Sequence, residues 1–218
     1  MSPSVTLTLQ RLPLFPLETV LFPGGWLPLR IFEVRYLDMV RRCHAVQAPF
    51  GVVCLTSGNE VETAHGRANG PERFHSTGTL ARIEHLAQPQ QGMLNVQCRG
   101  QQRFRVDHAE KLKHGLWVAD VTLLDNDLPA PVVDELSSTA NHLQQLLHTL
   151  AAQGGDASQL PLQPPYAWSD AGWVANRWAE LLPLPTTTKQ RLMTMDSPML
   201  RLELVADLLE QLRIDSAR

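Results

Sequence analysis

The sequence lacks the motifs of the commonest enzyme classes. It has no phosphate-binding G-x-x-x-x-G-K-[ST], no dinucleotide-binding G-x-G-x-x-G, no G-x-S-x-G around a serine nucleophile and no H-E-x-x-H zinc motif. The eight histidines show no spacing typical of metal ligands. We therefore expect a protein that is not an enzyme and that holds no cofactor and no metal ion.

Cysteines are also few, and long apolar runs are absent. The three cysteines form no C-x-x-C pair and no disulfide framework, which is typical of a reducing compartment. Cys43 and Cys54 fall in apolar patterns and are expected to be buried. Arg99 could lower the pKa of the Cys98 thiol, but neighbours on a strand point to opposite faces. The N-terminus does not read as a signal peptide, and no run reaches the roughly 18 apolar residues that span a bilayer. We expect a cytoplasmic protein without a membrane partner.

The composition is that of a globular protein with little net charge. The 218 residues are 44% hydrophobic, and 19 basic against 22 acidic residues give a net charge of −3. This balance excludes a disordered chain and a globally basic nucleic-acid binder. A local basic patch stays open as an alternative, because Arg103 and Arg105 are two apart on a predicted strand and therefore share a face. Further basic residues that could join the patch are Arg99, Lys111 and Lys113.

Residues 1–128 carry mainly the two-residue alternation of β-strands. Phe22-Pro23-Gly24-Gly25 suits a type II turn, with proline second and glycine third. An apolar stripe from Phe32 to Cys43, opposite Arg35 and other charged residues, predicts one helix. We expect a small, mostly antiparallel β-barrel whose open end this inserted helix covers. The predicted strand segments are Leu7–Leu9, Leu12–Leu14, Trp26–Phe32, Phe50–Leu55, Thr79–Leu86, Met93–Cys98, Arg103–Val106 and Leu116–Leu124.

Residues 129–218 change to the helical period, which predicts a second domain built as a small helical bundle. Thr187 with Gln190 has the form of a capping box, and Ser197 before Pro198 has the form of an N-cap. Gly154-Gly155 is expected to end the first of these helices. The fold class is therefore α+β, with a barrel domain at 1–128 and a bundle domain at 129–218.

Two features remain outside this pattern of strands and helices. The polar stretch Thr56–Gly78 has little apolar periodicity and is expected to be a long loop. Trp168, Trp173 and Trp178 cluster within eleven residues, and we expect them to pack in a core, since each buried tryptophan contributes about 4–6 kcal/mol. Trp26, just after the Pro-Gly turn, is a better candidate for contact with a ligand.

The block LPLFPLETVLFPGGWLPLRIFEVRY at residues 12–36 resembles the N-terminal domain of the ATP-dependent Lon proteases. The resemblance continues in Phe50-Gly51-Val52-Val53, in Gly78–Ile83, in Gly100–Val106 and in the Leu181-Leu182-Pro183-Leu184 segment, so it covers nearly the whole chain. It implies a PUA-like pseudobarrel followed by helices. In Lon proteases an ATPase module and a Ser-Lys peptidase domain follow this region; here neither is present, so we expect a stand-alone form.

The resemblance implies a non-catalytic module that binds proteins. Its partners would be unfolded or hydrophobic client segments, or a separate protease or chaperone. Arg30 and Glu33 could pair where the second strand meets the helix. Two alternatives stay open: an RNA-binding PUA-like protein that uses the basic patch, and an enzyme of unrecognised type. The oligomeric state is not predicted. The candidate binding residues are Phe22, Trp26, Arg30, Glu33, Tyr36, Arg103 and Arg105.

Overall fold

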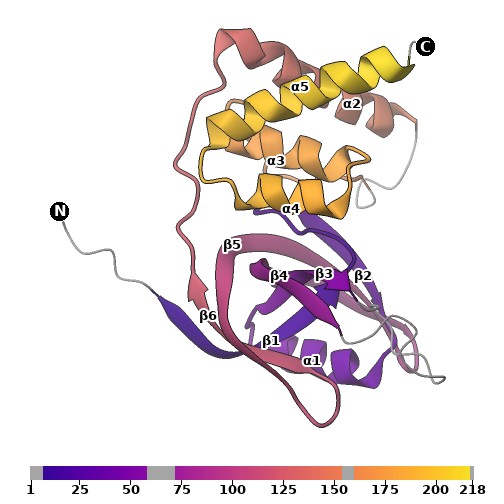
Figure 1. Ribbon diagram of the computed structural model, residues 1–218. Helices are drawn as coiled ribbons and strands as arrows, with labels where there is room; N and C mark the ends of the chain where they lie inside the picture. The colour runs from indigo at the N-terminus through magenta and orange to yellow at the C-terminus, as the bar shows by residue number, and fades with distance from the viewer. Residues whose placement is uncertain (1–6, 58–71, 154–159, 217–218) are drawn as a thin grey trace. The chain divides into compact units, whose positions relative to one another are not determined.

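A computed structural model describes residues 7–57, 72–153 and 160–216, with side chains in the last range up to residue 212. The contacts between residues divide the chain into two compact units, Met1–Asn126 and Asp127–Arg218. The first unit holds all the strands and one helix, and the second unit holds the other helices (Figure 1).

The first unit is a single six-stranded sheet of mixed direction in the order β2-β5-β4-β3-β1-β6. β1 and β3 are parallel, and the other neighbours are antiparallel. The predicted antiparallel character therefore holds for most of the sheet. The elements are β1 (Thr8–Leu17), β2 (Trp26–Ile31), α1 (Val34–Ala45), β3 (Phe50–Ser57), β4 (Arg73–Gln90), β5 (Met93–Lys111) and β6 (Trp117–Leu123).

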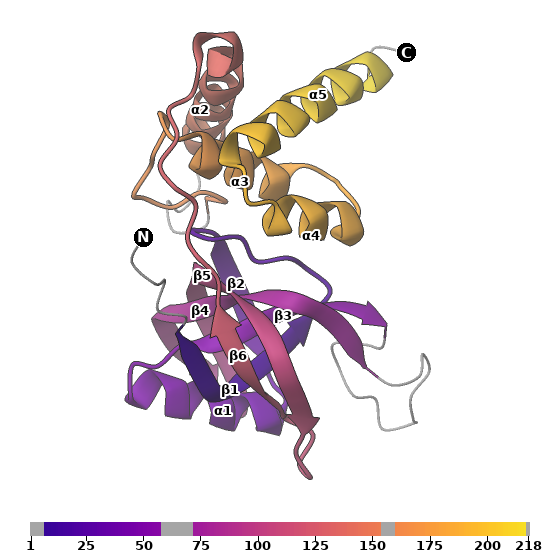
Figure 2. The same ribbon diagram turned by 60° about the vertical axis from the view of Figure 1, so that its left-hand side comes forward.

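The long, curved strand β5 organises this sheet, as Figure 2 shows from the side. One edge of β5 pairs with β4, while the other edge pairs with β2 in its first half and with β6 in its second half. The segments predicted as two strands, Met93–Cys98 and Arg103–Val106, are thus one strand. The sheet is not a regular barrel: the pairings β5-β4-β3-β1-β6-β5 return to their start, and β2 stands beside this circle at the end of the order.

The side chains that alternate to the inner face of the strands form two hydrophobic clusters inside the first unit. The larger one joins the buried face of α1 to strands β1 to β5, with Tyr36, Met39, Val40 and Cys43 all buried. The smaller one surrounds Phe104 between β1, β3, β4, β5 and β6. The helix was predicted correctly, but the predicted burial of Phe32 and the predicted exposure of Arg35 were wrong. Phe32 lies before the helix and is 55% exposed, and Arg35 is buried because it pairs with carboxylates.

The predicted type II turn at Phe22–Gly25 is confirmed. Gly24 has φ +75°, and the N–H of Gly25 donates to the carbonyl of Phe22 at 2.9 Å. Gly100 in β5 fastens the turn, because its carbonyl accepts from the N–H of Gly24 at 2.8 Å and its N–H donates to the carbonyl of Gly25 at 2.9 Å. A Cβ at position 100 would lie 2.1 Å from the carbonyl oxygen of Phe22, so this contact requires glycine.

The expected loop Thr56–Gly78 is shorter than predicted. Thr56 and Ser57 end β3, and β4 has already begun at Arg73. The polar composition hid these strand ends, because their side chains are exposed or half-buried. Residues 58–71 of the expected loop, like the Gly154-Gly155 helix end, lie outside the described residues.

The second unit packs its helices around α3, which contacts α2, α4 and α5. Of the two predicted caps, one is confirmed: the hydroxyl of Ser197 accepts from the N–H of Leu200 at 3.3 Å, at the start of α5. The other is wrong, because α4 begins two residues earlier than a cap at Thr187 requires, with Pro185 at the N-cap and without a side-chain cap. The elements are η1 (Asp134–Leu136), α2 (Ser137–Ala152), α3 (Ala171–Leu181), α4 (Thr186–Thr194) and α5 (Pro198–Ser216).

A buried arginine holds the second unit together. Arg201 of α5 is 1% exposed, and its guanidinium donates to the Asp127 carboxylate at 2.6 Å and to the Asn176 side chain at 2.9 Å. It also donates to the carbonyl oxygens of Leu192, at 2.9 Å, and Met195. The Arg201 side chain therefore links α5 to α3, to the C-terminal end of α4 and to Asp127, the first residue of the unit.

The tryptophans of the second unit follow the core prediction in part. Trp178 is buried, and its Nε1 donates to the carbonyl of Thr139 at 2.9 Å. Trp168 and Trp173 are half-buried and pack edge to face, with ring centroids 4.9 Å apart. Within the described ranges, no helix of either unit has the length and apolar character to span a bilayer.

Candidate binding site

Strand β2 offers an unpaired edge in the first unit. Among the strands in the described ranges, β5 alone pairs with it. Pro28, in the middle of β2, is itself typical of an edge strand because proline has no N–H to donate to a second neighbour. The register continues from Gly25, whose carbonyl accepts from Gly100. Residues 25, 27, 29 and 31 therefore direct their backbone groups toward β5, and Trp26, Pro28 and Arg30 direct theirs toward the unpaired edge.

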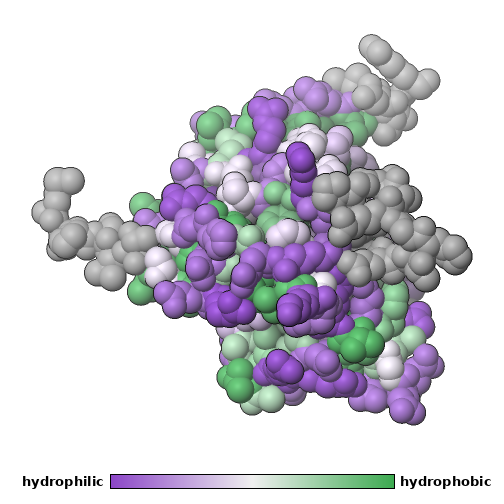
Figure 3. All heavy atoms as spheres, turned by 60° about the horizontal axis from the view of Figure 1, so that its bottom comes forward, coloured by the Kyte–Doolittle hydropathy of each residue, from purple (hydrophilic) through white to green (hydrophobic). Residues whose placement is uncertain are grey.

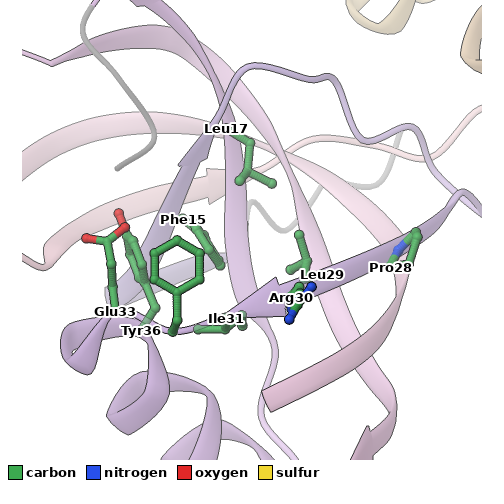
Figure 4. A pocket seen from close by; sticks show the side chains of 9 residues that line it. Phe15, Leu17, Pro28, Leu29, Arg30, Ile31, Glu33 and Tyr36 are labelled. Atoms are coloured by element: carbon green, nitrogen blue, oxygen red, sulfur yellow. The ribbon is translucent and has the colours of Figure 1, made fainter. Parts of the chain in front are cut away.

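An apolar cavity of about 260 Å³ lies beside this edge. Leu29 and Ile31 reach it from the inner face of β2, and Leu17 and Phe15 reach it from the end of β1 (Figure 4). β1 pairs with β6 only as far as Leu14, so the end of β1 that borders the cavity has left β6. The full lining is Phe15, Leu17, Pro28, Leu29, Arg30, Ile31, Phe32, Glu33 and Tyr36.

Aromatic stacking and ion pairs fix one end of the cavity. The rings of Phe15 and Tyr36 stack with centroids 4.0 Å apart, and Figure 4 shows Glu33 next to them. The Glu33 carboxylate pairs with Arg35 at 2.9 Å, and the guanidinium of Arg35 lies 4.6 Å from the centre of the Tyr36 ring. Arg35 also lies 3.7 Å from the carboxylate of Glu72. This end is therefore held in place before any ligand arrives.

The outer face of the same strands is polar and basic. Side chains from β2, β5 and β4 form three rows across it: Trp26 with Arg99 and Arg82, Pro28 with Gln97 and His85, and Arg30 with Asn95 and Ala87. A second hollow of about 660 Å³ covers the last two rows and shares Pro28, Leu29 and Arg30 with the apolar cavity. β2 is thus bordered by two hollows: the first is lined by Phe15, Leu17 and Ile31, and the second is lined by polar side chains such as Asn95 and Gln97 together with Leu86 and Val96.

The charges on this outer face are unevenly compensated. Arg82 pairs with Glu84 at 2.6 Å, and Arg99 lies 3.6 Å from the same carboxylate and 5.1 Å from the Trp26 ring centre. Arg30 is exposed and donates from Nε to the thioether sulfur of Met93 at 3.1 Å, a weak acceptor. Within the described part of the chain, Arg30 forms no ion pair with a carboxylate.

Three of the seven predicted binding residues meet at the cavity, namely Arg30, Glu33 and Tyr36. Trp26 lies at the other end of β2 and is half-buried. Phe22 is fully buried, so its prediction as a binding residue is wrong. Phe22 begins the turn that is fastened to Gly100 of β5. The expected pairing of Arg30 with Glu33 is also wrong, since Glu33 pairs with Arg35.

The two predicted arginines of the basic patch lie elsewhere in β5. Arg103 is 5% exposed and donates to the carbonyl of Asp125 at 3.3 Å, so it is not available to a surface patch as predicted. Arg105 is exposed and pairs with Asp107 at 3.1 Å. Lys111 pairs with Glu72 at 3.1 Å. Carboxylates and carbonyls thus take up most of the charge that an RNA backbone would need.

The cavity residues that the sequence did not single out are mainly apolar. Leu17, Leu29 and Phe15 look like ordinary core residues in a strand pattern. One usable signal was present: Pro28 inside a predicted strand marks an edge, and an edge strand is a place where a second chain can pair.

The cysteines offer no nucleophile. All three are free and buried. Burial, and next to it the Glu84 carboxylate, raises the pKa of the Cys98 thiol to about 12, which agrees with the prediction that Arg99 points to the opposite face. Burial also raises the pKa of Cys43. Among the described residues, no group of three or more histidine, cysteine or carboxylate side chains is arranged to hold a metal ion.

Among the described residues, exposed large hydrophobic side chains occur in both units, for example Leu7 and Phe32 in the first and Leu200 and Leu204 in the second. On the face shown in Figure 3, hydrophobic residues form small separate patches among hydrophilic ones. Phe32 lines the cavity beside β2, and its side chain is nevertheless 55% exposed. It places an aromatic ring at the mouth of the cavity.

Comparisons with known proteins agree with this architecture. A crystal structure of a Lon N-terminal domain protein from Xanthomonas campestris is similar at 32% sequence identity and a TM-score of 0.67, covering 91% of this chain and 98% of that one. The N-terminal domain of the Lon protease of Mycobacterium avium complex shares the fold at 18% identity and a TM-score of 0.52, covering 91% and 97%. No curated protein sequence gives a significant match.

The sequence itself matches a family profile over almost its full length. The profile describes the substrate-binding domain of ATP-dependent protease La (LON), and the match covers residues 11–211. The resemblance of the opening block is therefore confirmed for the chain as a whole. The chain belongs to the family of LON substrate-binding domains.

Proposed function

We propose that the chain is a non-catalytic binding module that takes up an extended protein segment along the free edge of β2. One observation carries the proposal: an unpaired strand edge runs directly beside an apolar cavity of about 260 Å³. A segment that adds to a sheet edge gains main-chain hydrogen bonds, and pockets beneath alternate side chains give it selectivity.

The backbone of β2 supplies a defined set of partners. Trp26 and Arg30 each present an N–H and a carbonyl to the free edge, and Pro28 presents a carbonyl. The residue of the added segment that faces inward at Leu29 would place its side chain in the cavity. Burying one leucine-sized side chain there contributes about 1.5–3 kcal/mol. Unfolded and hydrophobic segments fit this chemistry, because they expose both backbone groups and apolar side chains.

The test uses a short fluorescein-labelled peptide in which leucine alternates with serine, titrated with the full chain and followed by fluorescence anisotropy. We expect saturable binding. Leu29→Trp fills the cavity and should weaken binding by about tenfold or more. Leu27→Trp is the matched control, because Leu27 lies on the same inner face of β2 but does not line the cavity.

A second pair of peptides tests the strand addition itself. N-methylation of every second residue removes the N–H groups that face one side of an extended chain. Methyl groups in one of the two alternating frames should abolish binding, whereas the other frame should leave it intact. If neither frame matters, or if no peptide binds up to high micromolar concentration, the proposal is wrong.

Two further proposals concern the whole protein. We propose a PUA-like, distorted barrel for the first unit, which the closed circle of five paired strands supports. We propose a cytoplasmic location, which the three free cysteines support. RNA binding gains no support from the described residues, because Arg103 is buried and Arg105 is paired.

A further inference from the structure

We infer that the edge of β2 selects segments in which an acidic residue stands directly next to a bulky apolar residue. The inference rests on the proposed function and names the class of segment that the same site takes. It follows from the alternation along β2, which directs Leu29 toward the cavity and Arg30, whose partner is an uncharged sulfur, to the outer face.

Strand geometry makes the two requirements fall on neighbouring residues. Successive side chains of an added strand point to opposite faces of the sheet. The residue opposite Leu29 points inward, toward the 260 Å³ cavity, and the residue opposite Arg30 points outward, beside the guanidinium. Cβ atoms of directly opposite residues on antiparallel strands lie about 4.5–5.5 Å apart, within reach of a Glu–Arg pair.

Arg30 is the cation on the outer face that is available for such a pair. Arg82 and Arg99 share the carboxylate of Glu84, and Arg99 also covers Trp26. Arg30 contacts the sulfur of Met93, which carries no charge to offset its own. An outward carboxylate would therefore find its partner at Arg30, and an outward lysine would meet repulsion there.

The experiment compares three peptides that differ only in the residues flanking the central leucine: serine, glutamate or lysine. We expect the glutamate peptide to bind about two- to fivefold more tightly than the serine peptide, and the lysine peptide to bind more weakly by a similar factor. High salt should shrink these differences. Arg30→Glu should reverse the order of the three affinities. Arg41→Glu makes the same charge change at an exposed position of α1 and should preserve that order.

The possible results separate this inference from the proposed function. If the three peptides bind equally, or if Arg30→Glu does not change their order, the acidic preference is wrong and strand addition stands. If none of them binds, both are wrong. If the protein forms dimers that the peptides disperse, the edge is occupied by a second copy of β2, which overturns the proposed client class.

Discussion

At the scale of single residues, the structure depends on positions where a side chain would not fit. Gly100 is the clearest of them, since the turn before β2 lies directly on its Cα. The same turn begins with Phe22, whose ring is buried and therefore not available to a ligand. A residue of the neighbouring strand β5 thus fixes where β2 begins.

Gly100→Ala should destabilise the protein by about 2–3 kcal/mol, because the new Cβ would meet a backbone oxygen that cannot move alone. Gly92→Ala is the control: its Cβ would meet nothing within 4 Å, and only the positive φ of +78° would cost about 1 kcal/mol. Urea unfolding measures both. Equal losses would show that the close contact at Gly100 does not matter.

At the scale of elements, the ends of helices were only partly predictable. Ser197 and Thr187 both match capping patterns in the sequence. Ser197 caps α5, but α4 starts earlier, after Pro185, so Thr187 lies within its first turn. Pro183 and Pro185 fix the backbone φ angle before the helix, and the capping-box pattern of Thr187 with Gln190 does not take that constraint into account.

Ser197→Ala should therefore cost about 1 kcal/mol of stability, the usual loss when an N-cap side chain is removed. Thr187→Ala should change stability by less than about 0.5 kcal/mol, as surface substitutions generally do. Thermal and urea unfolding of the two variants would decide the matter. A larger loss for Thr187→Ala would contradict the cap assignment.

The strands show what a sequence can predict and what it cannot. Local chemistry predicted the turn at Phe22–Gly25, the helix α1 and most strand segments, because each depends on neighbouring residues. The burial of Arg35 and Arg103 depends on carboxylates and carbonyls far away in the chain, such as Glu72. The cavity was also hidden, since it exists only where β1 leaves β6 beside the edge of β2.

At the scale of the whole molecule, the division into two units places Asp127 with the helices. Its carboxylate is the partner of the buried Arg201 guanidinium. A domain boundary after residue 128, as the change from strand to helix periodicity indicated, would separate the Asp127 carboxylate from the Arg201 guanidinium. A boundary after Asn126 keeps them together, and we propose it as the domain limit.

A fragment of residues 127–218 should accordingly be more stable than one of residues 129–218, by about 3 kcal/mol, since the shorter piece leaves Arg201 buried without its carboxylate. Acetylation of both fragments removes the effect of the new terminal charge. The full-length chain with Asp127→Ala should show a similar loss in the unfolding of its helical unit. No difference in either comparison would mean that Asp127 does not stabilise the helices.

The alternation along β2 also constrains how this protein can change over evolutionary time. Inserting or deleting one residue after Trp26 would turn the Leu29 side chain to the solvent and the Arg30 side chain into the hydrophobic core. The remaining residues of the strand would exchange faces in the same way. The hairpin tip at Gly92, which has open space around it, has no such restriction. Lineages of this domain should therefore differ in length at the tip and keep the length of β2 constant.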